Sequence, residues 1–297
     1  MARIVILLAR SQAMEASPEL ENSIRTPEGG YRRKAKELSA AIAPMPTPWF
    51  TRALPTAVHP VVTIIGERSF RSSDSLAEKN PLWHTEESSW KAGNVMRMIN
   101  RHKISARTIC EVGCGAGEVL KQLQRRFDDK CDLLGCDVSP QAIELCRSRA
   151  NEKLHFELGD VTRIAGRFFD VILVLDIIEH LEDYFSFLRT IKERALYKIF
   201  HIPLDLSVQA VLRATPLMRD RERYGHIHYF TKETALQLLR DLGYDIIDWF
   251  YTAIALDLPS ATLKNVVMRF PRRLLYSINM DVAVRLLGGY RLLALTK

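Results

Sequence analysis

Between Thr108 and Ile202, short apolar runs alternate with amphipathic stretches of helical period. The runs are rich in Val, Ile, Leu and Cys, a composition that predicts strands buried on both faces. Strands that alternate with helices indicate βαβ units, and therefore a parallel sheet covered by helices on both sides. The expected strands are Thr108–Val112, Asp132–Cys136, Leu154–Leu158, Phe169–Leu175 and Tyr197–Ile202, and the expected helices are Trp90–Asn100, Gly117–Phe127, Pro140–Ala150 and Glu179–Arg194.

The C-terminal part departs from this rhythm. Thr231 is placed to cap a helix that ends at Gly243, and Tyr244–Thr252 follows as a strand. A helical segment, residues 253–289, then leads to a last strand at Tyr290–Leu295. The chain is therefore predicted to be an α/β protein with a Rossmann-like doubly wound sheet, mostly parallel, closed by an antiparallel C-terminal edge strand.

The domain organisation is expected to be uneven. Seven of the thirteen prolines fall in the first 60 residues, and they interrupt both helical and strand periodicity. We therefore expect residues 1–75 to be a poorly organised extension and residues 76–297 to form the domain. Two insertions, an irregular one at 203–230 and a helical one at 253–289, are expected on the substrate side.

Composition limits the class of protein. The 297 residues contain no apolar run long enough to cross a bilayer, so a soluble protein of the cytoplasm is the expectation. The five cysteines match no zinc-binding template, and their apolar neighbours favour structural thiols over a metal site or a disulfide framework: Cys110, Cys114, Cys131, Cys136 and Cys146.

The positive charge is concentrated at the C-terminus. The formal net charge is +7, and residues 260–297 contain seven basic side chains but one acid, Asp281. A nucleic-acid surface would spread its Lys and Arg over a whole face, so nucleic acid is an unlikely partner. A local basic segment interleaved with apolar residues can attract an anionic substrate or an anionic membrane, although a solvated helix face is the plainer interpretation.

A glycine-rich stretch carries the chemistry. Glu111-Val112-Gly113-Cys114-Gly115-Ala116-Gly117 lies between the first strand and its helix, where glycines permit a tight turn and let a ligand lie against bare backbone. Asp137 ends the second strand, where a carboxylate can bind ribose hydroxyls. Asp160 follows the third strand and could meet an adenine amino group. All three features lie at carboxyl ends of predicted strands, where open α/β sheets bind ligands.

With these motifs the chain resembles the class I S-adenosylmethionine-dependent methyltransferases, and most closely the branch that includes ubiquinone- and menaquinone-biosynthesis enzymes. The resemblance covers about Pro81 to Lys297. It implies S-adenosylmethionine as cofactor and a small-molecule methyl acceptor. By analogy, the methionine part of the cofactor would be held by Glu111, Gly113, Cys114, Gly115 and Gly117. Asp137 would hold the ribose, Val138 would lie beside the adenine, and the adenine edge would be held by Asp160 and Val161. The donor methyl group would be bordered by Leu175 and Asp176, in the stretch Leu175–Leu181.

Histidines supply the candidates for a general base, which an oxygen acceptor would need. His180, His201, His226 and His228 follow the fourth or fifth predicted strand, and His180 is the first choice. His226 and His228 could form a second base or a metal pair, but a pair lacks the third ligand of a zinc site, so no metal is expected.

Three functions are open at this point. The leading hypothesis is methyl transfer to an oxygen or nitrogen of a small, anionic or lipid-linked acceptor. A non-catalytic cofactor-binding module that docks through its basic segment is the first alternative, and a nicotinamide-dependent oxidoreductase is the second. The Asn/Asp-Pro-Pro-aromatic signature of enzymes that methylate nucleic-acid amino groups is absent, since Leu175-Asp176-Ile177-Ile178 stands in its place.

Overall fold

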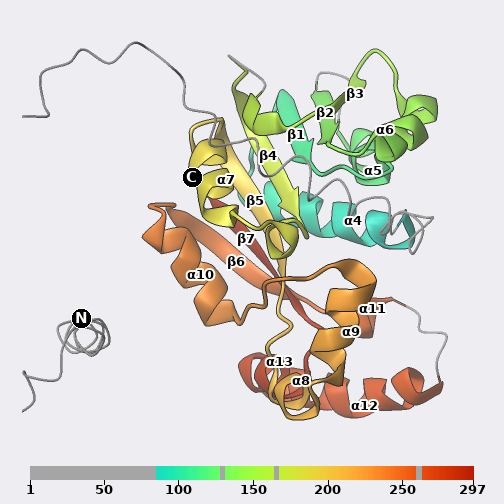
Figure 1. Cartoon of the computed structure of the whole chain (residues 1–297), viewed down its shortest axis with the longest axis vertical. Helices are drawn as coiled ribbons and strands as arrows, with labels where there is room; N and C mark the ends of the chain where they lie inside the picture. Colours follow the sequence, from blue (N-terminus) through green and yellow to red (C-terminus); the bar gives the residue numbers. More distant parts are fainter. Residues whose placement is uncertain (1–84, 128–130, 164–166, 259–262) are drawn as a thin grey trace, which may run out of the picture. The chain divides into compact units, whose positions relative to one another are not determined.

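A computed structural model describes residues 85–127, 131–163, 167–258 and 263–297. The expected extension, residues 1–75, lies outside them. The described part contains one seven-stranded sheet with the order β3-β2-β1-β4-β5-β7-β6 (Figure 1). Its strands are β1 (Thr108–Val112), β2 (Asp132–Asp137), β3 (Leu154–Leu158), β4 (Phe169–Leu175), β5 (Ala195–Pro203), β6 (Ile246–Thr252) and β7 (Arg291–Thr296).

The mixed sheet confirms the predicted fold class. Strands β1 to β5 pair in parallel, and β7 is antiparallel to both of its neighbours, β5 and β6. The C-terminal strand is therefore antiparallel, as predicted, but it lies second from the edge, because β6 pairs along its outer side. A consequence is that the first residues of β7 lie at the edge of the sheet where the parallel strands end.

Helices cover both faces of the sheet, as its alternating apolar side chains require. Ile109 and Leu133 pack with α4 (Thr85–Arg101) and α5 (Glu118–Gln124), whereas Cys110 and Leu134 face the core shared with α7 (Tyr184–Lys192) and α10 (Lys232–Asp241). Helix α6 (Pro140–Cys146) follows β2. All five cysteines are buried and none forms a disulfide bond, in keeping with structural thiols.

Local capping explains several helix starts. Ser139 accepts a hydrogen bond from the Ala142 N–H at 3.3 Å with Pro140 in the first turn, and Thr231 forms a capping box with Thr234 at the start of α10. The helix expected at Glu179–Arg194 begins later, at Tyr184, because Asp183 caps it; the residues before it form a short 3-10 turn, Ile178–His180.

The prediction of an irregular segment at 203–230 is wrong, since it contains α8 (Val208–Arg213) and α9 (Thr215–Tyr224). The helical segment 253–289 divides into α11 (Ile254–Asp257), α12 (Leu263–Ile278) and α13 (Met280–Leu287). Figure 1 shows α8, α9 and α11–α13 together as a helical group beyond one end of the sheet. No described helix combines the length and apolar character needed to cross a bilayer.

Candidate active site

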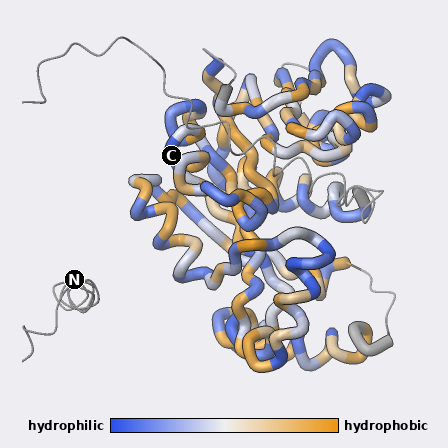
Figure 2. Tube along the Cα trace, in the orientation of Figure 1, coloured by the Kyte–Doolittle hydropathy of each residue, from blue (hydrophilic) through white to orange (hydrophobic). Residues whose placement is uncertain are grey.

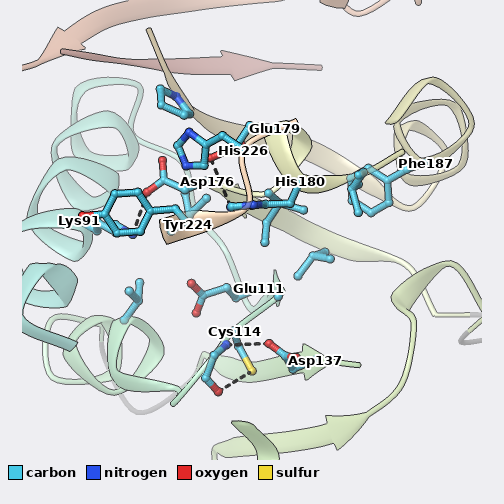
Figure 3. Close-up of a pocket in the computed structure, with 18 of the residues that line it drawn as sticks. Lys91, Glu111, Cys114, Asp137, Asp176, Glu179, His180, Phe187, Tyr224 and His226 are labelled. Carbon is cyan, nitrogen blue, oxygen red and sulfur yellow. Dashed lines mark hydrogen bonds and ion pairs between the residues drawn. The ribbon is translucent and has the colours of Figure 1, made fainter. Parts of the chain in front are cut away.

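A cavity of about 620 Å³ lies at the carboxyl ends of the parallel strands. Its walls come from the segments that follow β1 to β5, from α4 and α9, and from the turn that precedes β7. In Figure 3, Glu111, Cys114 and Asp137 lie on one side of the cavity, and Asp176, Glu179, His180 and His226 lie on the other. Its volume is that of a small-molecule site.

The loop between β1 and α5 forms one wall. Gly113 has φ +63°, and a Cβ there would meet Cδ1 of Ile177 at 2.2 Å, so this position requires glycine. The Cys114 N–H donates to the Cys136 carbonyl at 3.1 Å, which ties the loop to β2. The glycines therefore leave bare backbone facing the cavity beside two strand ends.

Asp137 holds this loop from the end of β2. Its two carboxylate oxygens accept hydrogen bonds from the N–H groups of Gly115 and Ser139, both at 2.9 Å. Burial raises the pKa of Asp137, and these N–H groups oppose that shift. Each oxygen keeps acceptor capacity, so the carboxylate can hold the loop and bind a hydroxyl pair at the same time.

Glu111 places a buried carboxyl group on the cavity wall. Its side chain is 3% exposed, and burial raises its pKa to about 8 despite the opposing charge of Lys91. Its Oε2 has no hydrogen-bond partner among the described residues. A buried oxygen in this state is costly unless something pairs with it, and an ammonium group on a bound molecule would do so.

A network of ion pairs surrounds Asp176 at the end of β4. Its carboxylate lies 2.8 Å from Lys91 Nζ, 3.0 Å from His201 Nδ1 and 3.5 Å from Arg291 Nε. Burial alone would raise the pKa of Asp176, but Arg291, Lys91 and His201 hold it well below its usual range. Glu87 on α4 completes the network, with its Oε2 at 3.1 Å from Arg291.

His201 belongs to this network and not to the lining of the cavity. Its Nε2 contacts Thr252 Oγ1 at 2.9 Å, and burial lowers its pKa although Asp176 opposes the shift. The imidazole is therefore neutral at physiological pH, and its role is to orient the Asp176 carboxylate.

Opposite the glycine loop, His226 is paired with a carboxylate. Its Nδ1 lies 2.7 Å from Asp205 Oδ2, just beyond the end of β5. A carboxylate at this distance fixes the tautomer with the proton on Nδ1, which leaves Nε2 as a proton acceptor. The ring of His180 lies edge-on at 5.0 Å, and its Nδ1 contacts the Gly225 carbonyl at 3.2 Å.

Glu179 lies beside the two histidines. The side chain is fully buried, and both carboxyl oxygens lack a hydrogen-bond partner among the described residues. Burial, with the nearby charge of Asp176, raises the pKa of Glu179 well above its usual range. Its backbone carbonyl accepts from the N–H groups of Ile227 and His228, which anchors the histidine segment.

Glu179, His180 and His226 could together hold a metal ion. One ligand atom from each lies within 4.8 Å of the others, so this set of three differs from the pair of His226 and His228 considered in the sequence analysis. A cation there would need Glu179 in its ionised form, so its affinity would rise with pH.

The structure brings most of the predicted site residues to this one cavity. The lining includes Glu111, Gly113, Cys114, Gly115, Asp137, Val138, Asp160, Val161, Leu175, Asp176, His180 and His226. Gly117 and His228 are not among the lining residues. Gly117 is the N-cap of α5, and His228 Nε2 contacts the Leu181 carbonyl at 2.9 Å beside the ring of Tyr184.

Sequence reasoning did not single out Asp205, Glu179 or Arg291 as site residues. Asp205 follows β5 by two residues, so the rule that ligands gather at carboxyl strand ends could have found it. Arg291 was counted only as part of the basic segment. Arg219 on α9 is also among the lining residues, and its side chain pairs with Asp220 at 3.0 Å.

Comparison with known proteins identifies the family. Residues 82–248, more than half of the chain, match the family model described as a methyltransferase domain. The chain belongs to the class I S-adenosylmethionine-dependent methyltransferases. The resemblance inferred from Glu111–Gly117, Asp137 and Asp160 is thereby confirmed, and with it S-adenosylmethionine as the cofactor of the family.

Individual relatives of this methyltransferase are distant. Ajmaline N-methyltransferase from Rauvolfia serpentina is 25% identical over 53% of this chain and 53% of its own length. Ubiquinone biosynthesis O-methyltransferase from Azorhizobium caulinodans is 34% identical over 27% of this chain and 33% of its own length. The chain thus spans about half, or less, of the length of these curated relatives.

Among solved structures, a chain from the complex of the Haloferax volcanii Trm112 methyltransferase activator with its partner protein has a similar fold. The TM-score is 0.51 at 16% sequence identity, and the similarity covers 78% of this chain and 96% of that chain.

The family match removes the reason for considering a nicotinamide-dependent oxidoreductase. One curated relative is named for nitrogen and another for oxygen, so the relatives do not select the accepting atom.

Proposed function

We propose that this protein transfers the methyl group of S-adenosylmethionine to an oxygen or nitrogen of a small-molecule acceptor. The observation that carries the proposal is the pairing of two half-sites across one cavity. One half has a glycine loop, Asp137 and Glu111, whose Oε2 has no hydrogen-bond partner among the described residues. The other half has His226 oriented by Asp205. When bound, the cofactor supplies a methyl group already activated by its sulfonium, so the protein mainly has to align the acceptor.

The residues on the first side fit the cofactor. Glu111 would ionise to pair with the ammonium of the methionine part, which relieves the cost of its unpaired Oε2. Asp137 would accept the ribose hydroxyls while it retains the N–H groups of the loop. Asp160, with its Oδ1 accepting from the Thr162 N–H at 2.8 Å, and Val161 would border the adenine, next to the half-exposed Val138.

On the second side, His226 is the general base of the proposal. Its Nδ1–H donates to Asp205, so Nε2 can take the proton that the acceptor loses as its oxygen or nitrogen bonds to the methyl carbon. Asp205 stabilises the imidazolium that forms. His180 is assigned to positioning the acceptor, because its Nδ1 contacts the neutral carbonyl of Gly225, which stabilises an imidazolium less than a carboxylate does.

A divalent cation is a second way to activate the acceptor. Glu179, His180 and His226 are close enough to share one, and a bound oxygen would lose its proton more easily beside it. Activity that survives exhaustive chelation would refute this route. If chelation abolishes activity and Mg²⁺, Mn²⁺ or Zn²⁺ restores it, activation of the acceptor by a cation would replace the role of His226 as general base.

We further propose that the acceptor is anionic or lipid-linked and that the protein makes peripheral contact with anionic membrane. The helical group formed by α8, α9 and α11–α13 supports this, because it contributes Arg219, Tyr224 and Ile254 to the cavity wall. Arg219 retains 63% of its side-chain exposure, so it can meet an acidic group at the cavity mouth.

Thermal unfolding in the presence of S-adenosylhomocysteine tests the cofactor assignment. At about a hundredfold excess over Kd the ligand should stabilise the folded state by about 2.7 kcal/mol, a rise in Tm of about 5–10 °C. Asp137→Ala should lose most of this rise, whereas Asp132→Ala, at the exposed opposite end of β2, should keep it. NADH should have no effect. No rise in a folded wild-type protein would refute the proposed function.

A panel of acceptors then separates enzyme from binding module. Turnover of S-adenosylmethionine with any hydroxyl or amino acceptor supports catalysis. If the cofactor binds but no acceptor in a broad panel is methylated, the non-catalytic alternative replaces this proposal.

A further inference from the structure

Helix α12 presents its apolar side to solvent. Val267, Phe270, Leu274 and Ile278 recur every three or four residues, and their side chains are 63%, 77%, 54% and 72% exposed. An amphipathic helix of a globular domain ordinarily turns such a stripe toward the core. In α12, Leu275 and Tyr276 pack against the core, and this second apolar stripe faces solvent.

Specific contacts fix this orientation from the other side of the helix. The guanidinium of Arg269 donates to the carbonyl oxygens of Ala255 and Leu256, at 3.2 and 2.9 Å, and to that of Leu258. Tyr276 stacks on Tyr290, with ring centroids 5.2 Å apart and planes 8° apart. An arginine and a tyrosine therefore hold α12 against the domain, and the apolar stripe faces outward as a result.

Neighbouring helices extend the exposed surface. Met280 on α13 and Leu212 at the end of α8 are 54% and 81% exposed, and α13 packs against both α12 and α8. Figure 1 places these three helices together, and Figure 2 shows hydrophobic stretches along them. We call the surface made by Val267, Phe270, Leu274, Ile278, Met280 and Leu212 the apolar face.

The charge beside the apolar face is positive. Helices α8 and α12 contain no Asp or Glu, and Arg213 and Arg273 are exposed at their ends and flanks. The acid of α13, Asp281, is engaged by Lys232 at 2.6 Å and by the Tyr251 hydroxyl. A second copy of the chain placed symmetrically on this face would bring like charges together, whereas an anionic bilayer offers both an apolar layer and opposite charge.

We propose that the apolar face is a docking surface for an anionic bilayer, with the side chains of α12 inserted at the headgroup boundary. The same helical group lines the cavity through Tyr224 of α9 and Ile254 of α11, and Tyr290, on which Tyr276 of α12 stacks, lines it from the turn before β7. Docking would therefore hold the acceptor side of the cavity next to the lipid, where an acceptor with a lipid tail resides. This consequence for the acceptor rests on the proposed function; the docking itself does not.

Co-sedimentation of the full chain with vesicles tests the proposal. The vesicles are phosphatidylcholine alone and phosphatidylcholine mixed with phosphatidylglycerol, each at low and high salt. One variant removes three apolar side chains from the face, and a matched control removes three exposed apolar side chains from β3, β5 and β6. The test variant is Val267→Ser with Phe270→Ser and Ile278→Ser, and the control is Leu158→Ser with Leu196→Ser and Ile247→Ser.

We expect the wild type to bind the anionic vesicles and not the neutral ones. The test variant should bind at least about tenfold more weakly, because three partly inserted side chains are lost, and Arg273→Gln about fivefold more weakly. The control variant should bind as the wild type does. An unchanged Tm rise with S-adenosylhomocysteine shows that each variant is folded.

Absence of wild-type binding at low salt would overturn the proposal, and so would full binding by the test variant. If the wild type does not bind vesicles but forms a dimer, and the test variant is a monomer, the apolar face is assigned to contact with a second copy of the chain instead. Failure of S-adenosylhomocysteine to bind, with vesicle binding intact, would refute the proposed function and leave the docking surface standing.

Discussion

Asp176→Asn tests the buried ion network with little other disturbance. Asp176 has φ +56°, a left-handed conformation that Asn also tolerates, so the substitution removes the charge without adding backbone strain. The lost carboxylate lies 2.8 Å from Lys91 Nζ and 3.5 Å from Arg291 Nε. Two cations then share the one remaining carboxylate, that of Glu87.

The expected loss of stability follows from this imbalance. Breaking a buried ion pair costs about 3–5 kcal/mol because the remaining charge is left uncompensated. Glu87 stays 3.1 Å from Arg291 and 3.8 Å from Lys91, so the lower end, about 3 kcal/mol, applies. For a domain of this size that corresponds to a fall in Tm of about 6–12 °C.

Thermal and urea unfolding of the unliganded protein at neutral pH measure this loss. Glu118→Gln is the matched control, since it removes the partner of Arg149 in a pair at 2.8 Å that is more accessible to solvent, and it should cost less than about 1 kcal/mol. If Asp176→Asn costs no more than this control, the network does not stabilise the fold as argued here.

The contribution of Asp176 to the free energy of unfolding changes with pH in a definite direction. The pKa of Asp176 is held well below its usual range, so its contribution to the free energy of unfolding is fully present above about pH 4, where the unfolded carboxyl ionises. That contribution is lost as the pH falls toward the folded pKa. The difference between wild type and Asp176→Asn should therefore be constant near neutrality and shrink in acid.

Three further predictions concern the cavity. Glu111 has a pKa raised to about 8, so the unliganded wild type should lose stability relative to Glu111→Gln as the pH rises from about 5 to about 8; parallel unfolding curves would contradict this. Asp205→Asn should lower kcat by about 10²–10⁴-fold because His226 loses its oriented tautomer, with S-adenosylhomocysteine binding unchanged by calorimetry; an unchanged kcat would exclude His226 as base. Gly117→Ala, at φ +74° and with its Cβ 2.4 Å from Phe156, should lower the free energy of unfolding by about 2 kcal/mol or more, and a neutral effect in urea would show that the loop can relax.

The central strands of the sheet were predictable because they are buried on both faces. Phe169–Leu175 and Thr108–Val112 are nearly continuous apolar runs, and each was predicted with its observed bounds. Helices α8 and α9 were missed for the opposite reason. In α9 no residue is buried, so the sequence Thr215–Tyr224 carries no apolar stripe, although Pro216 near its start is a helix signal.

The cofactor side of the site was predictable from local sequence, and the other side was not. The glycine loop, Asp137 and Asp160 each follow a recognisable strand. The partners of Asp176 come from α4, β5 and β7, far apart in the sequence, and no local pattern reports that they meet. Asp205 and His226 likewise come from different segments, so their pairing required the fold.

The antiparallel strand explains why the basic C-terminal segment is not one surface. Because β7 runs against β5, its first residue, Arg291, lies at the carboxyl edge of the parallel strands, where it is partly buried against Asp176 and Glu87. Arg269 is used to hold α11, and Arg273 alone of these three remains exposed beside the apolar face. A net charge summed along the sequence counts together basic side chains that build the site, basic side chains that fix a helix, and basic side chains that are exposed and can contact a partner. Only strand order and helix orientation separate them, and for that reason the docking proposal depends on the outward stripe of α12 and not on the net charge.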